Sequence, residues 1–124
     1  MKLRMAMVFA TDMQRMTAFY RDGVGLRFLS DVSKPDWSEF DAGGVKFSLH
    51  EIPARLAQDI QIAQPPQARS ATPIKLFFET DDLAAARQRS SALGGVMGDV
   101  HERLGFPACD GVDPEGNVFT LVQG

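Results

Sequence analysis

Short apolar runs separated by turn residues make up most of the chain, and two helical patterns interrupt them. Residues 4–10 form an apolar run of strand length, and the next residues, Thr11 and Asp12, are types favoured at helix N-caps. Apolar side chains then recur at helical spacing until the glycine-containing segment 22–25 ends the pattern, at Met13, Met16, Phe19 and Tyr20. Strands are predicted next over residues 27–32, 37–41 and 45–51, the last two joined by a hairpin turn at 41–44.

The same order of elements returns after a segment of a different kind. Residues 53–73 are rich in Gln, Ala and Pro, with a short helical possibility at 56–62, and we expect them to connect two halves of the chain and to act partly as a lid over a pocket. A strand is predicted at 74–80, after which Asp81 or Asp82 caps a helix of strong helix formers that ends at Gly94-Gly95. Strands at 96–103, 106–112 and 117–123 follow, with a turn at 113–116.

The two halves repeat each other in residues as well as in pattern. Asp12-Met13 returns as Asp82-Leu83, and the motif D-x-x-G-x-x-F-[ST]-L occurs at 41–49 and again at 113–121. The sequence therefore predicts one domain made of repeat one (1–52), a connection (53–73) and repeat two (74–124), each repeat in the order βαβββ. A lone unit of this kind cannot bury both faces of its sheet. We expect an α+β fold in which the two repeats form a curved, cupped mixed sheet with the helices outside.

Composition and charge narrow the possible functions. The 124 residues are 44% hydrophobic and 23% charged, which is typical of a globular domain. A net charge of −3 and scattered Lys and Arg residues argue against nucleic-acid binding, because no basic stripe is present to neutralise phosphates. Cys109 is the only cysteine, which excludes a disulfide framework. No apolar stretch is long enough for a membrane span or a signal peptide, so we expect a cytoplasmic protein without a membrane partner.

The order of predicted elements, with the residues at their turns and helix ends, resembles the vicinal oxygen chelate superfamily. This superfamily includes glyoxalases, extradiol dioxygenases and bleomycin-resistance proteins. The segments that carry the resemblance are Asp12-Met13, the run F-Y-R-D at 19–22 with Gly25-Leu26, and the turn D-P-E-G-N at 113–117. The similarity covers nearly the whole chain except the connection. It implies the fold strongly and the function weakly, since the superfamily contains isomerases, oxygenases, transferases and binding proteins.

The resemblance also implies where a metal ion would bind. In metal-dependent members of the superfamily, His, Gln or Glu ligands come from the first and last strands of each repeat. Placing that pattern here by the flanking motifs gives Met5, Ser48, Lys75 and Thr120. None of these is a suitable ligand for Zn²⁺ or Mn²⁺, and the ammonium group of Lys75 would repel a cation. The sequence therefore predicts no metal ion and no other cofactor.

A rearranged site is the alternative. Strand alternation places His50 on the same face as Ser48, and Glu79 on the same face as Lys75 and Phe77. His50 and Glu79, with Glu39 as a third ligand, would form a non-standard metal set. Otherwise His50 and Glu79 would act as an acid–base pair, with Lys75 stabilising an oxyanion.

Three functions remain open on this evidence. The first is a metal-free small-molecule binding protein that sequesters its ligand in an aromatic-lined cup, with a preference for anionic ligands. Its predicted ligand-binding residues are Met5, Met7, Trp37, Ser48, His50, Lys75, Phe77 and Thr120. The second is a glyoxalase-like lyase, isomerase or dioxygenase that uses the rearranged site. The third is a non-catalytic partner module. In each case we expect a homodimer, as the resemblance implies and as two-fold assemblies are the commonest.

Overall fold

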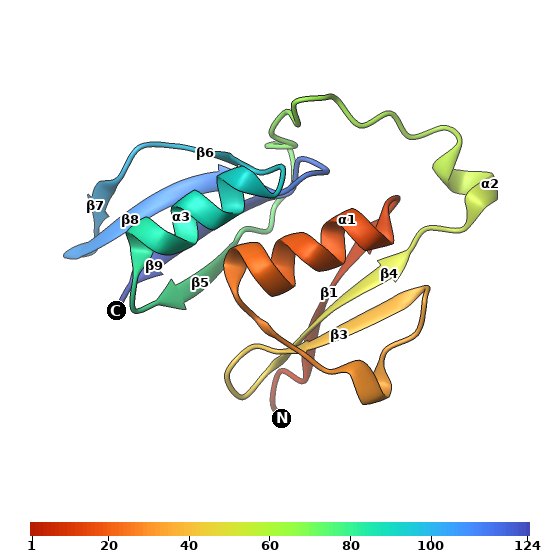
Figure 1. Ribbon diagram of the computed structural model, residues 1–124, viewed down its shortest axis with the longest axis horizontal. Coiled ribbons are helices and arrows are strands. Elements are labelled where there is room, and N and C mark those ends of the chain that lie inside the picture. Colours follow the sequence, from red (N-terminus) through yellow and green to blue (C-terminus); the bar gives the residue numbers. More distant parts are fainter.

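The computed structural model describes all residues from Met1 to Gly124, and its strands form two separate sheets (Figure 1). The first sheet is four-stranded, in the order β1-β4-β3-β2. Its strands are β1 (Met5–Ala10), β2 (Arg27–Phe28), β3 (Trp37–Asp41) and β4 (Lys46–Glu51). β1 pairs with β4 in parallel, and the other pairs are antiparallel.

The second sheet repeats this order with one added strand. It is five-stranded, in the order β5-β9-β8-β6, with β7 also paired to β8. Its strands are β5 (Leu76–Thr80), β6 (Val96–Met97), β7 (His101–Arg103), β8 (Phe106–Val112) and β9 (Val118–Gln123). β5 pairs with β9 in parallel, as β1 does with β4. The predicted α+β fold of two βαβββ repeats is confirmed, although the strands join in two sheets rather than in one continuous sheet.

Helices cover one face of each sheet. α1 (Met13–Ala18) continues as a π-helix, η1 (Phe19–Val24), and lies over the first sheet, whereas α3 (Leu83–Ala92) lies over the second (Figure 1). Asp12 and Asp82 cap these helices in the same way, since each side chain accepts a hydrogen bond from the backbone N–H three residues later. Two short helices complete the chain, the 3-10 turn η2 (Ser30–Val32) and α2 (Ala54–Ala57).

The hydrophobic core lies between the helices and the sheets and is shared by both repeats. Alternation along β4 and β9 sends every second side chain into this core, and these residues are buried: Phe47, Leu49, Phe119 and Leu121. The Phe47 ring meets Phe78 of the other repeat edge to face, with ring centroids 5.8 Å apart. The opposite faces of the sheets carry no helix. We call them the first open face (on β1, β4 and β3) and the second open face (on β5, β9, β8 and β7).

Buried polar contacts also join the repeats. The hydroxyl of Tyr20 in η1 donates a 2.7 Å hydrogen bond to Asp113, in the turn between β8 and β9. Two residues on, the carboxylate of Glu115 accepts hydrogen bonds from the backbone N–H groups of Thr11 and Asp12. The turn of repeat two therefore satisfies the exposed amides at the start of the helix in repeat one.

Three sequence-based boundaries were wrong. The strand expected at 27–32 is only Arg27–Phe28, because η2 follows immediately. The strand expected at 96–103 divides into β6 and β7. The helix expected at 56–62 is the single turn Ala54–Ala57, because a segment with this many Gln, Ala and Pro residues has no periodic apolar face to bury.

The connection between the repeats is held at the β8–β9 turn. The backbone N–H of Arg69 donates a 2.8 Å hydrogen bond to Gly116 O, and a Cβ atom added at Gly116 would collide with the backbone of Gln67. Gly116 also has a φ of 89°, which favours glycine. Both the close contact with Gln67 and the backbone conformation therefore require a glycine here. The connection contributes no residue to the cleft between the two repeats, so it is not a lid over that cleft.

Candidate functional site

The register of the first sheet arranges the side chains of its open face in three rows across the strands. Phe9, His50 and Trp37 form one row, because β4 pairs His50 with both of the others. The rings are close together: the Phe9 and Trp37 centroids lie 5.9 and 5.5 Å from that of His50. Phe9 is 52% exposed, so the row presents an aromatic surface to solvent.

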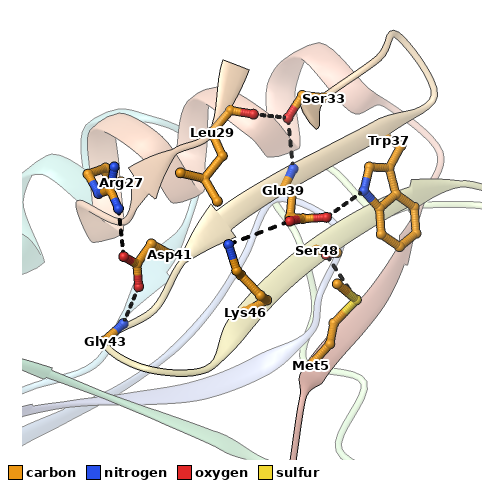
Figure 2. Close-up of polar contacts among 10 residues, drawn as sticks. All are labelled: Met5, Arg27, Leu29, Ser33, Trp37, Glu39, Asp41, Gly43, Lys46 and Ser48. Atoms are coloured by element: carbon orange, nitrogen blue, oxygen red, sulfur yellow. Dashed lines mark hydrogen bonds and ion pairs between the residues drawn. The ribbon is translucent and has the colours of Figure 1, made fainter. Parts of the chain in front are cut away.

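The middle row contains Met7, Ser48 and Glu39. Figure 2 shows Ser48 and Glu39 of this row. Glu39 is occupied by its neighbours: one carboxylate oxygen accepts a 3.2 Å hydrogen bond from the indole of Trp37, and the other lies 3.7 Å from Nζ of Lys46. These contacts fix the indole ring against the sheet.

The third row consists of Met5, Lys46 and Asp41, which is tied to Arg27 at the sheet edge (Figure 2). Arg27 donates a 2.7 Å hydrogen bond to the carboxylate of Asp41. This contact and the backbone N–H groups of Gly43 and Gly44 lower the pKa of Asp41 to about 2. The row is therefore held in ion pairs at the rim of the face.

The second open face is organised around Asp110 of β8. Its carboxylate accepts a 2.6 Å hydrogen bond from the hydroxyl of Thr120 and a 2.8 Å hydrogen bond from Nζ of Lys75. A guanidinium nitrogen of Arg103 lies 3.6 Å away. Desolvation opposes ionisation of Asp110, but the contacts with Lys75, Thr120 and Arg103 outweigh it and lower its pKa.

The two faces correspond to each other under the internal repeat. Ser48 pairs with Glu39 in the first sheet as Thr120 pairs with Asp110 in the second. In each case a hydroxyl lies beside a carboxylate, and a lysine neutralises the carboxylate. Asp110 and Arg103 were not among the residues predicted from sequence. Neither offset of the sequence repeat carries Glu39 onto Asp110, and no sequence signal indicated Arg103.

The four positions at which the superfamily holds its metal ion come together in two pairs, one on each sheet. The hydroxyl of Ser48 contacts the sulfur of Met5 at 3.3 Å, and Lys75 and Thr120 meet at Asp110. A thioether, two hydroxyls and an ammonium do not form a ligand set for a hard or borderline divalent ion. No cluster of three or more His, Cys, Asp or Glu side chains occurs elsewhere in the chain. The residues present do not fit the metal.

The structure does not bring together the proposed acid–base pair. His50 packs between two aromatic rings on the first open face, whereas Glu79 lies on β5 of the other sheet, in register with Val122. The Glu79 carboxylate lies against Gly124. Within one chain, His50, Glu79 and Glu39 therefore form neither a dyad nor a ligand set.

A cleft runs between the repeats, where the edge strands β1 and β5 separate. It has a volume of about 850 Å³. Its floor is apolar and comes from both repeats, with Ala6, Phe47, Leu76, Phe78 and Leu121. Of the residues predicted from sequence, Phe77 and Glu79 line the cleft and Trp37 and His50 do not.

Comparison with known proteins identifies the fold and the family. A family model described as a glyoxalase-like domain matches residues 5–122. No curated protein matches at a significant level. Also, no helix of the chain has the length and apolar character needed to cross a membrane.

Solved structures match over nearly the whole chain. A glyoxalase/bleomycin resistance protein/dioxygenase family enzyme from Burkholderia phytofirmans PsJN superposes with a TM-score of 0.75 at 22% identity, covering 99% of this chain and 98% of that one. A glyoxalase/bleomycin resistance protein from Albidiferax ferrireducens T118 gives 0.71 at 18% identity, with 98% of each chain covered.

A fosfomycin resistance protein from Mesorhizobium loti is a further structural neighbour. It gives a TM-score of 0.66 at 16% identity, covering 98% of this chain and 89% of that one. Identities this low establish the shared fold and no shared activity. Together with the family model, they show that the chain belongs to the glyoxalase-like domain family, within the superfamily that its repeat and turn motifs resemble.

Proposed function

We propose that this protein binds a small molecule on its open faces without a metal ion, and that binding is its activity. The observation that carries the proposal is the exposed row of Phe9, His50 and Trp37, which lies next to a metal position occupied by Ser48 and Met5. Aromatic surface on a rigid sheet gives a large contact area with little loss of side-chain entropy. Met7, which is 40% exposed, adds a flexible apolar wall beside the row.

The alternative is a glyoxalase-like enzyme. It has less support, because the only candidate general base and acid, His50 and Glu79, lie on different sheets of one chain. It requires a second chain to bring them within hydrogen-bonding distance. The two functions differ in one measurable respect: an enzyme converts the ligand it binds, whereas a binding protein releases it unchanged.

We also propose that the protein is a homodimer. Both sheets are open and leave edge strands unpaired, among them β1 in the first and β5 in the second. Large apolar side chains are exposed on both faces, among them Met7, Phe9, Phe77 and Phe106. Exposed strand edges and apolar groups of this kind favour association, and a two-fold pair is its simplest closed form. Light scattering should give a mass twice the 13.6 kDa of one chain.

The test of binding uses Trp37, the only tryptophan, as a fluorescent reporter. A library of small aromatic and aliphatic metabolites is screened for saturable quenching in metal-free buffer, and each hit is analysed for chemical conversion. H50A should weaken the hits at least tenfold, because His50 contacts both rings of the row. R55A is the control, since Arg55 lies in α2, outside both open faces. Conversion of a hit, or equal binding by H50A, would overturn the proposal.

A further inference from the structure

Phe77 on the second open face has an unusual environment. Its ring is 50% exposed and borders the cleft between the repeats. Two cations lie near it: Nζ of Lys75 is 5.9 Å from the ring centroid, and the guanidinium carbon of Arg103 is 5.8 Å away. An exposed aromatic ring with Lys75 and Arg103 beside it offers both apolar contact and positive charge.

The Arg103 guanidinium has donors that the protein does not use. It donates no hydrogen bond, its Nε has no partner although the atom is buried, and its nearest carboxylate oxygen, on Asp110, is 3.6 Å away. Arg103 pairs with Phe106 of β8, and its guanidinium reaches Phe77 of β5 on the same face of the sheet. The side chain is still 40% exposed, so part of its planar donor group is open to a ligand.

The two cations beside Phe77 have one carboxylate between them as an ion-pair partner. Lys75 and Arg103 share one carboxylate, that of Asp110, which also accepts a hydrogen bond from Thr120. Glu79, the other carboxylate on this part of the face, lies against Gly124 and forms no ion pair. Arg103 is therefore the cation beside Phe77 that has no hydrogen-bonded carboxylate partner.

We infer that the second open face takes a planar aromatic carboxylate, with its ring packed on Phe77 at the mouth of the cleft and its carboxylate paired with Arg103. Lys75, already bound to Asp110, supplies long-range attraction, and Arg103 is the residue that determines specificity. Arginine suits this role because its fork matches the two oxygens of a carboxylate. The inference rests on the proposed function and names the class of ligand that it concerns.

The experiment compares two probes that differ only in charge, 2-naphthoate and 2-naphthamide. Each is titrated into the ¹⁵N-labelled full-length protein, and shifts are followed at the backbone amides of β5, β8 and β9. We expect naphthoate to bind at least tenfold more tightly than naphthamide, with the largest shifts around Phe77 and Thr120, and the difference to shrink as salt is added. R103Q should weaken naphthoate at least tenfold and leave naphthamide unchanged.

Two further variants separate charge from shape. R103K keeps the charge and loses the fork, so it should fall between wild type and R103Q. R55Q removes a surface arginine in α2, outside both faces, and should bind naphthoate as the wild type does. Equal binding of the two probes by the wild type, or equal loss of both in R103Q, would overturn the inference.

Failure here can be distinguished from failure of the proposed function. If library compounds bind beside Trp37 while naphthoate leaves the amides of β5 and β9 unshifted, ligand binding stands and the aromatic carboxylate class is wrong. If no compound binds either face, both proposals are wrong.

Discussion

The hydroxyl of Tyr20 donates its hydrogen bond to Asp113 across 93 residues of sequence, and so joins the helix of one repeat to the turn of the other. Both groups are buried, with Asp113 fully inaccessible to solvent. Asp113 also accepts hydrogen bonds from Asn117 and from the backbone N–H of Glu115. Its carboxylate is thus surrounded by donors, which allows it to be buried at the junction of the repeats.

Removing the Tyr20 hydroxyl should destabilise the protein. Y20F leaves the ring in the core but deprives a buried carboxylate of one donor, and we expect a loss of about 1–3 kcal/mol in the free energy of unfolding. Urea denaturation measures this loss. D113N and the double variant complete a mutant cycle, in which the coupling between the two sites should exceed roughly 0.5 kcal/mol. Strictly additive losses would contradict a direct interaction.

The pKa values of Asp113 and Asp110 should lie on opposite sides of the ordinary pKa of an aspartate side chain. Burial raises the pKa of Asp113, and its hydrogen bonds from Tyr20 and Asn117 only partly oppose this. A carboxyl group whose folded pKa is raised stabilises the fold most below its unfolded value of 3.8, and this contribution declines as the pH rises through the folded value. Carboxyl-carbon NMR should place the midpoint of Asp113 above 3.8.

The pKa of Asp110 is lowered despite its partial desolvation, because Lys75 and Thr120 donate hydrogen bonds to the ionised form. Ionised Asp110 therefore stabilises the fold fully above pH 3.8, its unfolded pKa. This contribution is lost as the pH falls through the lowered pKa of the folded state. The same NMR titration should show a midpoint below 3.8, and K75Q should raise it. A midpoint unchanged in K75Q would mean that the contact is not formed in solution.

Glu115 should act as a cap for the helix of the other repeat. E115A leaves the backbone N–H groups of Thr11 and Asp12 without an acceptor, and we expect a loss of about 1–2 kcal/mol, as for other helix caps. E115Q retains one side-chain acceptor oxygen and should lose less. Thermal unfolding of the two variants gives the comparison. If the glutamine variant is as unstable as the alanine variant, the negative charge rather than hydrogen bonding holds the repeats together.

Divalent metal ions should neither bind tightly nor stabilise the protein. An ion at a hundred times its dissociation constant would add about 2.7 kcal/mol to the free energy of unfolding. Met5, Ser48, Lys75 and Thr120 do not form a ligand set that would hold one. Melting curves with Mn²⁺, Fe²⁺, Ni²⁺ or Zn²⁺ should match the curve in chelator. One ion per chain by elemental analysis would direct attention to His50, Glu79 and Glu39 across a dimer.

The sequence by itself determined the repeats, the order of their elements and the capping residues Asp12 and Asp82, because period, propensity and turn chemistry act over a few neighbouring residues. It also predicts unsuitable side chains at the positions where the resemblance would place a metal ion, and that placement stays a prediction. The boundaries at 27–32 and 96–103 were missed because a strand ends where its partner strand ends, which local pattern does not record.

Only the tertiary structure decided which polar groups meet. Tyr20 was predicted as a helix residue and Asp113 as a turn residue, and their bond arises from the packing of one repeat on the other. The position of Arg103 over Phe77 likewise depends on how β7 is placed against β8 and β5. Such long-range contacts result from the burial of the shared core as a whole, so no short stretch of sequence encodes them.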